Sequence, residues 1–364
     1  MFKIPFISLS KQSVSDVDSE HRRPLQPVVT LTRIIRVVIL LLAAFLIVLI
    51  ISLVTGPGDV SPFFLASRLF SVFQGAEAGL DQAEKTILLS IRLPRILFAG
   101  IVGAALSAAG VVFQAVLRNP LADPYILGIS GGAAVGAIIG IIIGAGAVPF
   151  GVAGLAFLGA LLTIITIFGV AGSRTDGQSN TLLLTGVIIN AFFSAIIMFL
   201  IAMSSSDRLH SVFFWLMGDL SLAEGSEVLF TALFLLTGFI VMLFHARSLN
   251  LLLTGEETAM QLGVDVEKTK KILLVTASMT TAAAVSVSGT IGFVGLIIPH
   301  LLRLTLGPDH RLLLPAAVLF GASFLAAADT IARSVMAPVE LPVGVITALC
   351  GAPYFIYLLY RRSV

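Results

Sequence analysis

Few residues in this sequence have the type and spacing that chemistry at an active site requires. The five histidines do not pair at helical spacing, and Cys350 is the only cysteine, so neither a metal centre nor an internal disulfide is indicated. The phosphate-binding pattern Gly-x-x-x-x-Gly-Lys-Ser/Thr does not occur, so the chain is not expected to hydrolyse ATP by that route. We therefore expect no metal, no cofactor and no enzymatic activity, and any nucleotide energy must come from a partner.

Ionisable residues within or beside the apolar runs are more informative. Asp329 is the one clear acidic candidate inside such a run. Charges in lipid are costly, so an acid of this kind can serve ion coupling. The favoured interpretation is a hydrogen bond to a neighbouring helix or a pair with Arg333, four residues later. Arg92, Arg95 and Arg333 fall at the ends of apolar runs, where they could contact a partner or extend to the lipid headgroups.

Composition indicates the elements that must position these residues. The chain of 364 residues is 57% hydrophobic and only 12% charged, with a mean hydropathy of +1.06, which is typical of a polytopic membrane protein. The small net charge of +2 argues against a nucleic-acid partner. Runs long enough to cross or nearly cross a bilayer predict an all-α chain of ten transmembrane helices. These runs fall at about 34–54, 95–116, 125–144, 147–171, 181–203, 228–245, 271–288, 291–306, 312–335 and 342–360.

The distribution of basic residues predicts the orientation of these spans. An even number of spans puts both termini on one side, and sixteen Lys and Arg residues then share that side, whereas six lie opposite. By the positive-inside bias, both termini are cytoplasmic. Residues 1–30 are expected to be a polar cytoplasmic tail and 31–364 the membrane domain, with the first span retained rather than cleaved. The six opposite residues are Arg68, Lys85, Arg92, Arg95, Arg208 and Arg333.

Residues 245–271 form the one long charged loop on the cytoplasmic side. Thr254 followed by Glu257 resembles a capping box, and Gly263 is placed to end the helix that it would start. Asp265 is placed to cap a second helix. We expect two short helices outside the bilayer, although a simple interfacial re-entry into the next span is an alternative.

Glycines recur at every fourth position from Gly128 to Gly144, after the turn Asn119-Pro120-Leu121-Ala122-Asp123-Pro124. At helical spacing they share one face and let a neighbouring backbone approach closely. Tight helix packing without a further role is the favoured interpretation.

Several motifs in one colinear order, from about residue 34 to the C-terminus, resemble the permease subunits of type II ABC importers for iron-siderophores, haem and cobalamin. They include Ile91-Arg92-Leu93-Pro94-Arg95, the 110–124 segment, the 254–263 loop, Gly292 to Arg303, Asp309-His310-Arg311 and Glu340-Leu341-Pro342-Val343-Gly344.

The resemblance implies a homodimer of ten-span subunits in the lipid of the bacterial cytoplasmic (inner) membrane. Two copies of a cytoplasmic ABC ATPase would bind below, and an extracytoplasmic substrate-binding protein would dock above. It implies docking through Arg92, Arg95 and Arg333. It implies ATPase coupling through short helices at 255–262 and 266–270, with Gly255, Glu256, Ala259, Leu262 and Gly263 on the matching motif. Ser179 and Asn180 would lie at a cytoplasmic gate, although their flanking residues depart from the usual family run.

The function implied is ATP-driven import of an iron chelate by alternating access. Iron-siderophore uptake is the commonest role of this family, and haem and cobalamin are the other cargoes. An ion-gradient-driven secondary transporter is the competing class, in which Asp329 would carry the coupling ion. A membrane-embedded enzyme has no supporting constellation of residues.

Overall fold

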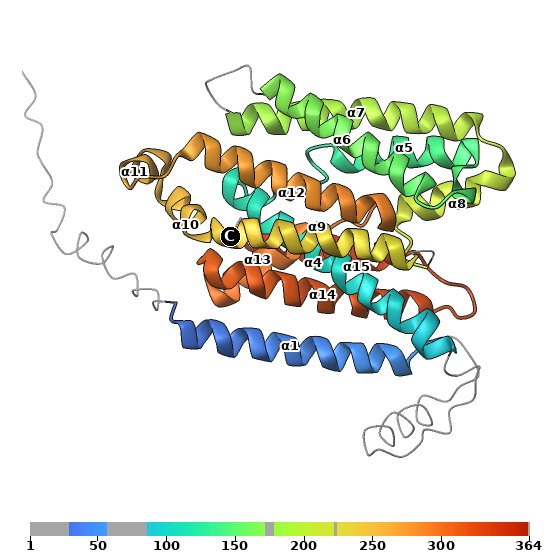
Figure 1. The fold of residues 1–364 in the computed structure, drawn as a ribbon, viewed down its shortest axis with the longest axis horizontal. Helices are drawn as coiled ribbons and strands as arrows, with labels where there is room; N and C mark the ends of the chain where they lie inside the picture. The colour runs from blue at the N-terminus through green and yellow to red at the C-terminus, as the bar shows by residue number, and fades with distance from the viewer. Residues whose placement is uncertain (1–28, 57–85, 172–177, 222–223, 363–364) are drawn as a thin grey trace, which may run out of the picture.

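A computed structural model describes residues 29–56, 86–171, 178–221 and 224–362, and all regular structure within them is helical. The helices run roughly side by side in one bundle, with α10 and α11 projecting at one end (Figure 1). The helices are α1 (Leu31–Val54), the π-helical η1 (Thr86–Arg92), α4 (Leu93–Val116), α5 (Ile129–Ile143), the 3-10 turn η2 (Ala145–Ala147), α6 (Gly151–Ala171), α7 (Gln178–Met203), α8 (Ser206–Met217), α9 (Gly225–Phe244), α10 (Ala246–Thr254), α11 (Glu256–Gln261), α12 (Val266–Ser288), α13 (Val294–Leu306), α14 (His310–Ser334) and α15 (Val343–Arg362).

The ten apolar runs of the sequence correspond to ten of these helices. Seven segments of the described chain are long and apolar enough to cross a membrane, and the shorter apolar helices in α5, α13 and α15 account for the other three predicted spans. The chain is therefore a multi-pass membrane protein. Of the six basic residues predicted to share one side, Arg68 and Lys85 lie outside the described residues.

The central helix of the bundle is α4. Its apolar window is 89% buried, whereas only 6% of the corresponding window of α1 is buried. Small residues allow this burial: a methyl group added to Gly110 would overlap the backbone of Gly295 in α13, and one added to Gly103 would overlap the backbone of Gly321 in α14. Because lipid supplies little hydrophobic drive between helices, such close backbone contact is what holds the centre together.

The glycine ridge of α5 packs as the sequence indicates. A side chain at Gly132 would collide with Thr163 and Gly159 of α6, and one at Gly136 would collide with the Leu155 carbonyl. Gly128 and Gly144 are the cap residues of α5 and have positive φ angles of 78° and 77°. Their role is to begin and end the helix. The ridge is thus a helix-packing device.

Local capping positions the helices that matter for the site. The Asp309 side chain accepts a hydrogen bond from the Arg311 N–H at the start of α14, and Asp265 does the same for Lys268 at the start of α12, as the sequence predicts for Asp265. We call the end of the bundle where α1 and α14 finish and α4 begins the arginine end. The opposite end carries residues 246–262, which we call the α10–α11 segment.

Candidate functional site

The arginine end holds an ion-pair cluster that three helices and one loop assemble. Its centre is Asp329, whose side chain is 1% exposed. Arg95 donates to both oxygens of this carboxylate, from Nε at 3.1 Å to each and from Nη2 at 2.9 Å to Oδ1. The Nη1 of Arg95 donates to Glu340 Oε2 at 2.7 Å. One guanidinium thus binds two carboxylates, with a forked geometry that lysine could not provide.

The other two predicted arginines complete this cluster. Arg333 Nε lies 3.8 Å from Asp329 Oδ2, and its Nη2 donates to the Ser52 carbonyl near the end of α1. Arg92 Nη1 donates to the Leu53 carbonyl at 2.8 Å. Both arginines therefore supply donors and positive charge to the last carbonyls of α1, which have no partner within that helix.

The structure brings the three predicted arginines together, because Arg95 and Arg333 contact the same Asp329 carboxylate, and Arg333 and Arg92 bind the successive carbonyls of Ser52 and Leu53. We name Arg92, Arg95, Asp329, Arg333 and Glu340 the arginine cluster. Three positive and two negative side chains leave it with a formal charge of +1. Arg92 and Arg333 are each only 3% exposed, whereas the side chain of Arg95 is 12% exposed and that of Glu340 is 36% exposed. Arg95 and Glu340 therefore form the accessible part of the cluster.

Sequence reasoning identified Asp329 but not its main partner. Asp329 bonds to a neighbouring helix and pairs with Arg333, and both alternatives that the sequence left open are confirmed. The partner Arg95 is 234 residues away, and Glu340 is 245 residues from Arg95. In the sequence, the only indication that Arg95, Asp329 and Glu340 could meet is that each lies near the end of a separate apolar run.

At the opposite end, the α10–α11 segment packs with the start of α12 around a small separate core. Leu252, Ala259 and Val266 are buried against one another, with Leu251 and Val264 packed beside them. Met260 is 55% exposed and Leu262 is 61% exposed, so the tip of the segment presents two accessible apolar side chains among the exposed polar residues Glu257, Thr258 and Gln261.

Two expectations for this segment are corrected by the structure. Gly255, not Thr254, is the N-cap of α11, and the Thr254 hydroxyl donates to the Leu251 carbonyl within α10. The predicted capping box is therefore wrong. The helix expected at 266–270 is the first part of the continuous α12, because no residue there breaks a helix. The two short helices are instead α10 and α11.

The five predicted coupling residues serve different structural roles. Gly255 and Gly263 adopt positive φ angles of 128° and 84° at the two ends of α11, which explains why glycine is present. Glu256 accepts a 2.6 Å hydrogen bond from the Lys270 ammonium. Ala259 is fully buried, which leaves Leu262 as the exposed apolar member of the set.

The turn between α4 and α5 contacts the α10–α11 segment. Arg118 has a φ of 49°, and its Nη2 donates to the Leu252 carbonyl at 2.9 Å and lies 4.0 Å from Glu256 Oε1. Asp123 lies deeper in the turn and accepts a hydrogen bond from the Tyr125 N–H at 2.9 Å. Burial raises the pKa of the Asp123 carboxyl to about 6, against the opposing effect of the Tyr125 bond.

Asn250 connects α10 to the start of α14. Its side-chain amide donates to Asp309 Oδ1 at 2.9 Å, and its oxygen accepts from the His310 N–H at 2.8 Å. Burial alone would raise the pKa of Asp309, but hydrogen bonds from Arg311 and Asn250 outweigh it and hold the pKa at about 2. The α10–α11 segment is thereby attached to α14 through an ionised, well-bonded carboxylate.

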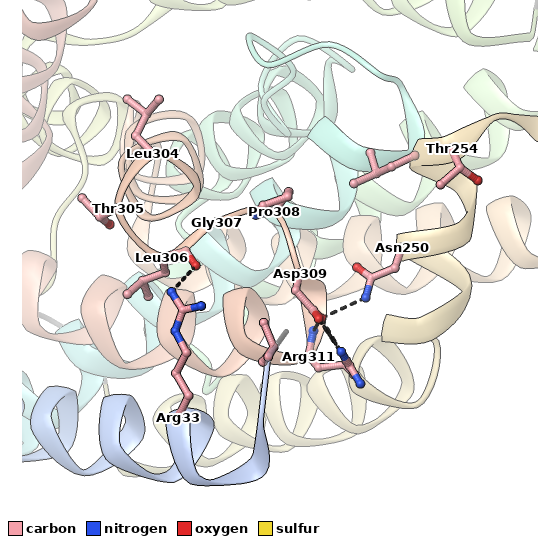
Figure 2. A pocket seen from close by; sticks show the side chains of 12 residues that line it. Arg33, Asn250, Thr254, Leu304, Thr305, Leu306, Gly307, Pro308, Asp309 and Arg311 are labelled. Atoms are coloured by element: carbon pink, nitrogen blue, oxygen red, sulfur yellow. Dashed lines mark hydrogen bonds and ion pairs between the residues drawn. The ribbon is translucent and has the colours of Figure 1, made fainter. Parts of the chain in front are cut away.

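A cleft of about 630 Å³ lies beside this attachment, between the start of α1, α10 and the α13–α14 connection. Figure 2 shows Arg33 reaching across it to the Leu306 carbonyl, at 3.0 Å, and Asp309 bonded to Asn250 and Arg311. Arg33, Asp309 and Arg311 thus form hydrogen bonds or ion pairs with other groups of this same chain. The cleft therefore marks where α1 joins the bundle.

Ser179 and Asn180 lie in the first turn of α7, and their side chains are outside the described part of the structure. Within the described residues, no group of three or more His, Cys, Asp or Glu side chains could hold a metal ion.

Comparison with known proteins connects these features to a family. Residues 25–361 match the FecCD transport family. The cobalamin import system permease protein BtuC of Halobacterium salinarum is 46% identical over 79% of this chain and 76% of its own length. The hemin transport system permease protein HmuU of Yersinia pestis is 41% identical over 88% of this chain and 96% of its own length.

A solved structure gives the same answer for the fold. An inward-facing transporter of the metal-chelate ABC type superimposes with a TM-score of 0.77 and 33% identity, covering 90% of this chain and 99% of that one. The family match over residues 25–361 includes both the arginine cluster and the α10–α11 segment. This chain therefore belongs to the FecCD transport family and is an ABC importer permease, not an enzyme.

Proposed function

We propose that this chain is one half of a homodimeric permease that imports a bulky metal chelate across a bacterial cytoplasmic membrane. Two ABC ATPases would act at the α10–α11 end, and a substrate-binding protein would dock at the arginine end. The observation that carries the proposal is that one bundle holds two unlike interaction features at its opposite ends, an ion-pair cluster and a short helical segment that exposes Met260 and Leu262.

The orientation follows from the direction of the helices. The first helix, α1, begins at the α10–α11 end, and α15 runs from the arginine end back toward it (Figure 1). Both termini would then share the side to which the sequence assigns sixteen of its basic residues, which is the cytoplasm by the positive-inside bias. The arginine cluster would face the extracytoplasmic side.

The docking role rests on the charge and accessibility of the arginine cluster. Its formal charge is +1, and Arg95 offers a guanidinium that acidic side chains of a partner can approach beside Glu340. Complementary charge of this kind increases the rate of association and selects the partner. Arg92 and Arg333 would support it from below through their bonds to the end of α1.

The coupling role rests on the shape of the α10–α11 segment. Its glycine-bounded helix and the cap residue after it expose Met260 and Leu262, while Leu252 and Ala259 are buried. A small projection that packs on a separate core with the start of α12 can seat in a groove of an ATPase and move with it as a rigid unit. Arg118 and Asn250 would pass that motion to α4 and α14.

The cargo proposed is an iron-siderophore, haem or cobalamin. The named relatives import cobalamin and hemin, and each of these is a large metal chelate. Ser179 and Asn180, at the start of α7, are proposed as small polar residues of the cytoplasmic gate. A bulky cargo would pass such a gate between two copies of the chain.

The proposal is tested with the permease and its ATPase reconstituted in lipid. Replacing Arg92 and Arg95 with Gln removes two charges while keeping donor groups, and we expect it to remove most stimulation of ATP hydrolysis by the binding protein. Arg208→Gln, which removes an arginine charge in the first turn of α8, is the control and should retain stimulation. Full stimulation of the double variant would contradict the docking role.

The structure offers little support for an ion-gradient-driven carrier. Such a carrier needs an acid that can exchange its ion, and Asp329 accepts three hydrogen bonds from Arg95. Uptake by the permease alone in liposomes, driven by a proton or sodium gradient, is the result that would favour this class.

A further inference from the structure

We propose that Glu340 occupies, within this chain, the position that a carboxylate of the binding protein takes on Arg95 during docking. The inference rests on the proposed docking function and specifies how the site is regulated. Glu340 would act as an internal competitor that covers Arg95 in the undocked permease and leaves it when the partner arrives.

The first argument is the unequal burial of the two carboxylates on Arg95. Asp329 is 1% exposed and receives the Nε and Nη2 donors of the guanidinium. Glu340 is 36% exposed and receives only Nη1, at 2.7 Å. A buried, doubly bonded carboxylate holds its arginine in place. An exposed ion pair contributes little net free energy, so Glu340 is the carboxylate that can be displaced.

The second argument is that displacement needs only a side-chain movement. The backbone on both sides of Glu340 is anchored: the Val339 N–H before it donates to the Met336 carbonyl at 2.9 Å, and the Leu341 N–H after it donates to the Ala332 carbonyl at 3.1 Å. The main chain of the loop can therefore stay in place. Rotation of the Glu340 side chain toward solvent would expose Arg95 Nη1.

The third argument is the charge balance. With Glu340 bound, Arg95 has two acidic neighbours, so an incoming carboxylate meets repulsion as well as attraction. When Glu340 leaves and a partner carboxylate replaces it, the number of ion pairs on Arg95 is unchanged. The exchange thus permits docking without leaving a buried charge uncompensated, and it keeps the affinity moderate.

The test measures binding of the system's own substrate-binding protein to the permease–ATPase complex in lipid nanodiscs. The probe is that protein, purified after its capture on the tagged complex. We expect Glu340→Gln to tighten binding by about two- to fivefold, the ratio that corresponds to the strength of an exposed ion pair. The gain should shrink as salt is raised, because exposed charges are screened.

The matched control is Glu224→Gln. Glu224 is an exposed acid before α9, so this variant makes the same change in net charge without removing a partner of Arg95. Glu340→Asp serves as a second variant, because its shorter side chain keeps the charge but cannot reach Arg95 equally well. We expect unchanged affinity for Glu224→Gln and an intermediate gain for Glu340→Asp.

The outcomes separate the two proposals. Unchanged or weaker binding by a folded Glu340→Gln variant overturns the competitor role, as does an equal gain in Glu224→Gln. If Glu340→Gln does not fold, the Glu340→Asp result decides in the same way. If the wild-type complex captures and binds no such protein, the proposed docking function fails instead.

Discussion

Asp329→Asn is the substitution for which the structure gives the clearest expectation. The amide has nearly the same shape and keeps one oxygen that can accept from Arg95. The negative charge is lost, however, and Arg95 and Arg333 then lie 12% and 3% exposed beside a neutral group. Removal of one partner from a buried ion pair typically costs about 3–5 kcal/mol, because the remaining charge is uncompensated.

We expect the free energy of unfolding to fall by this amount, roughly 3–5 kcal/mol, and the midpoint of thermal unfolding in detergent to fall by several degrees. The assay is a double-mutant cycle with Arg95→Gln. Because both substitutions disrupt one interaction, the double variant should lose much less than the sum of the two single losses. Strictly additive losses would refute the assignment of Asp329 as the centre of the cluster. So would a stability equal to wild type in Asp329→Asn.

Two further predictions concern packing and pH. Gly110→Ala should destabilise the chain by about 1–3 kcal/mol or more, because its methyl group would overlap the Gly295 backbone. The control in the same thermal unfolding assay is Gly169→Ala, because Gly169 has open space around it. Equal stability of the two variants would contradict the packing argument. Burial raises the pKa of Asp123 from 3.8 to about 6, so the folded state holds this proton more tightly, and stability should decline as pH rises from about 4 to about 6 and level off above. Asp123→Asn should remove that part of the pH dependence, and an unchanged profile would contradict the assignment.

The membrane topology was predictable because its signal is local. Each apolar run is long enough to be recognised without knowledge of its neighbours, so the ten spans were found near their observed positions. The caps at Asp265 and Gly263 were predictable for the same reason. Thr254 was misassigned because two residues in succession could have begun the helix, and the choice of Gly255 depends on how α10 packs.

The arginine cluster could be predicted only in part. Arg92, Arg95 and Arg333 are recognisable from their positions at helix ends, but nothing in the sequence indicates that Arg95 binds two carboxylates more than 230 residues away. Such pairings depend on which helices are neighbours. That information resides in close contacts, such as Gly103 against Gly321 in α14, rather than in hydropathy.

Two helices connect the ends of the molecule where partners are proposed to bind. Near its start α4 carries Arg95, and just beyond its end Arg118 contacts the α10–α11 segment. Similarly, α14 begins at Asp309, which bonds to Asn250 of α10, and carries Asp329 near its end. The 24 residues of α4 correspond to about 36 Å at 1.5 Å per residue, which is enough to cross the hydrocarbon core. Because α4 and α14 are joined by Arg95 and Asp329 at one end and by glycine contacts between, a displacement of the α10–α11 segment would move both helices together and reach the arginine cluster.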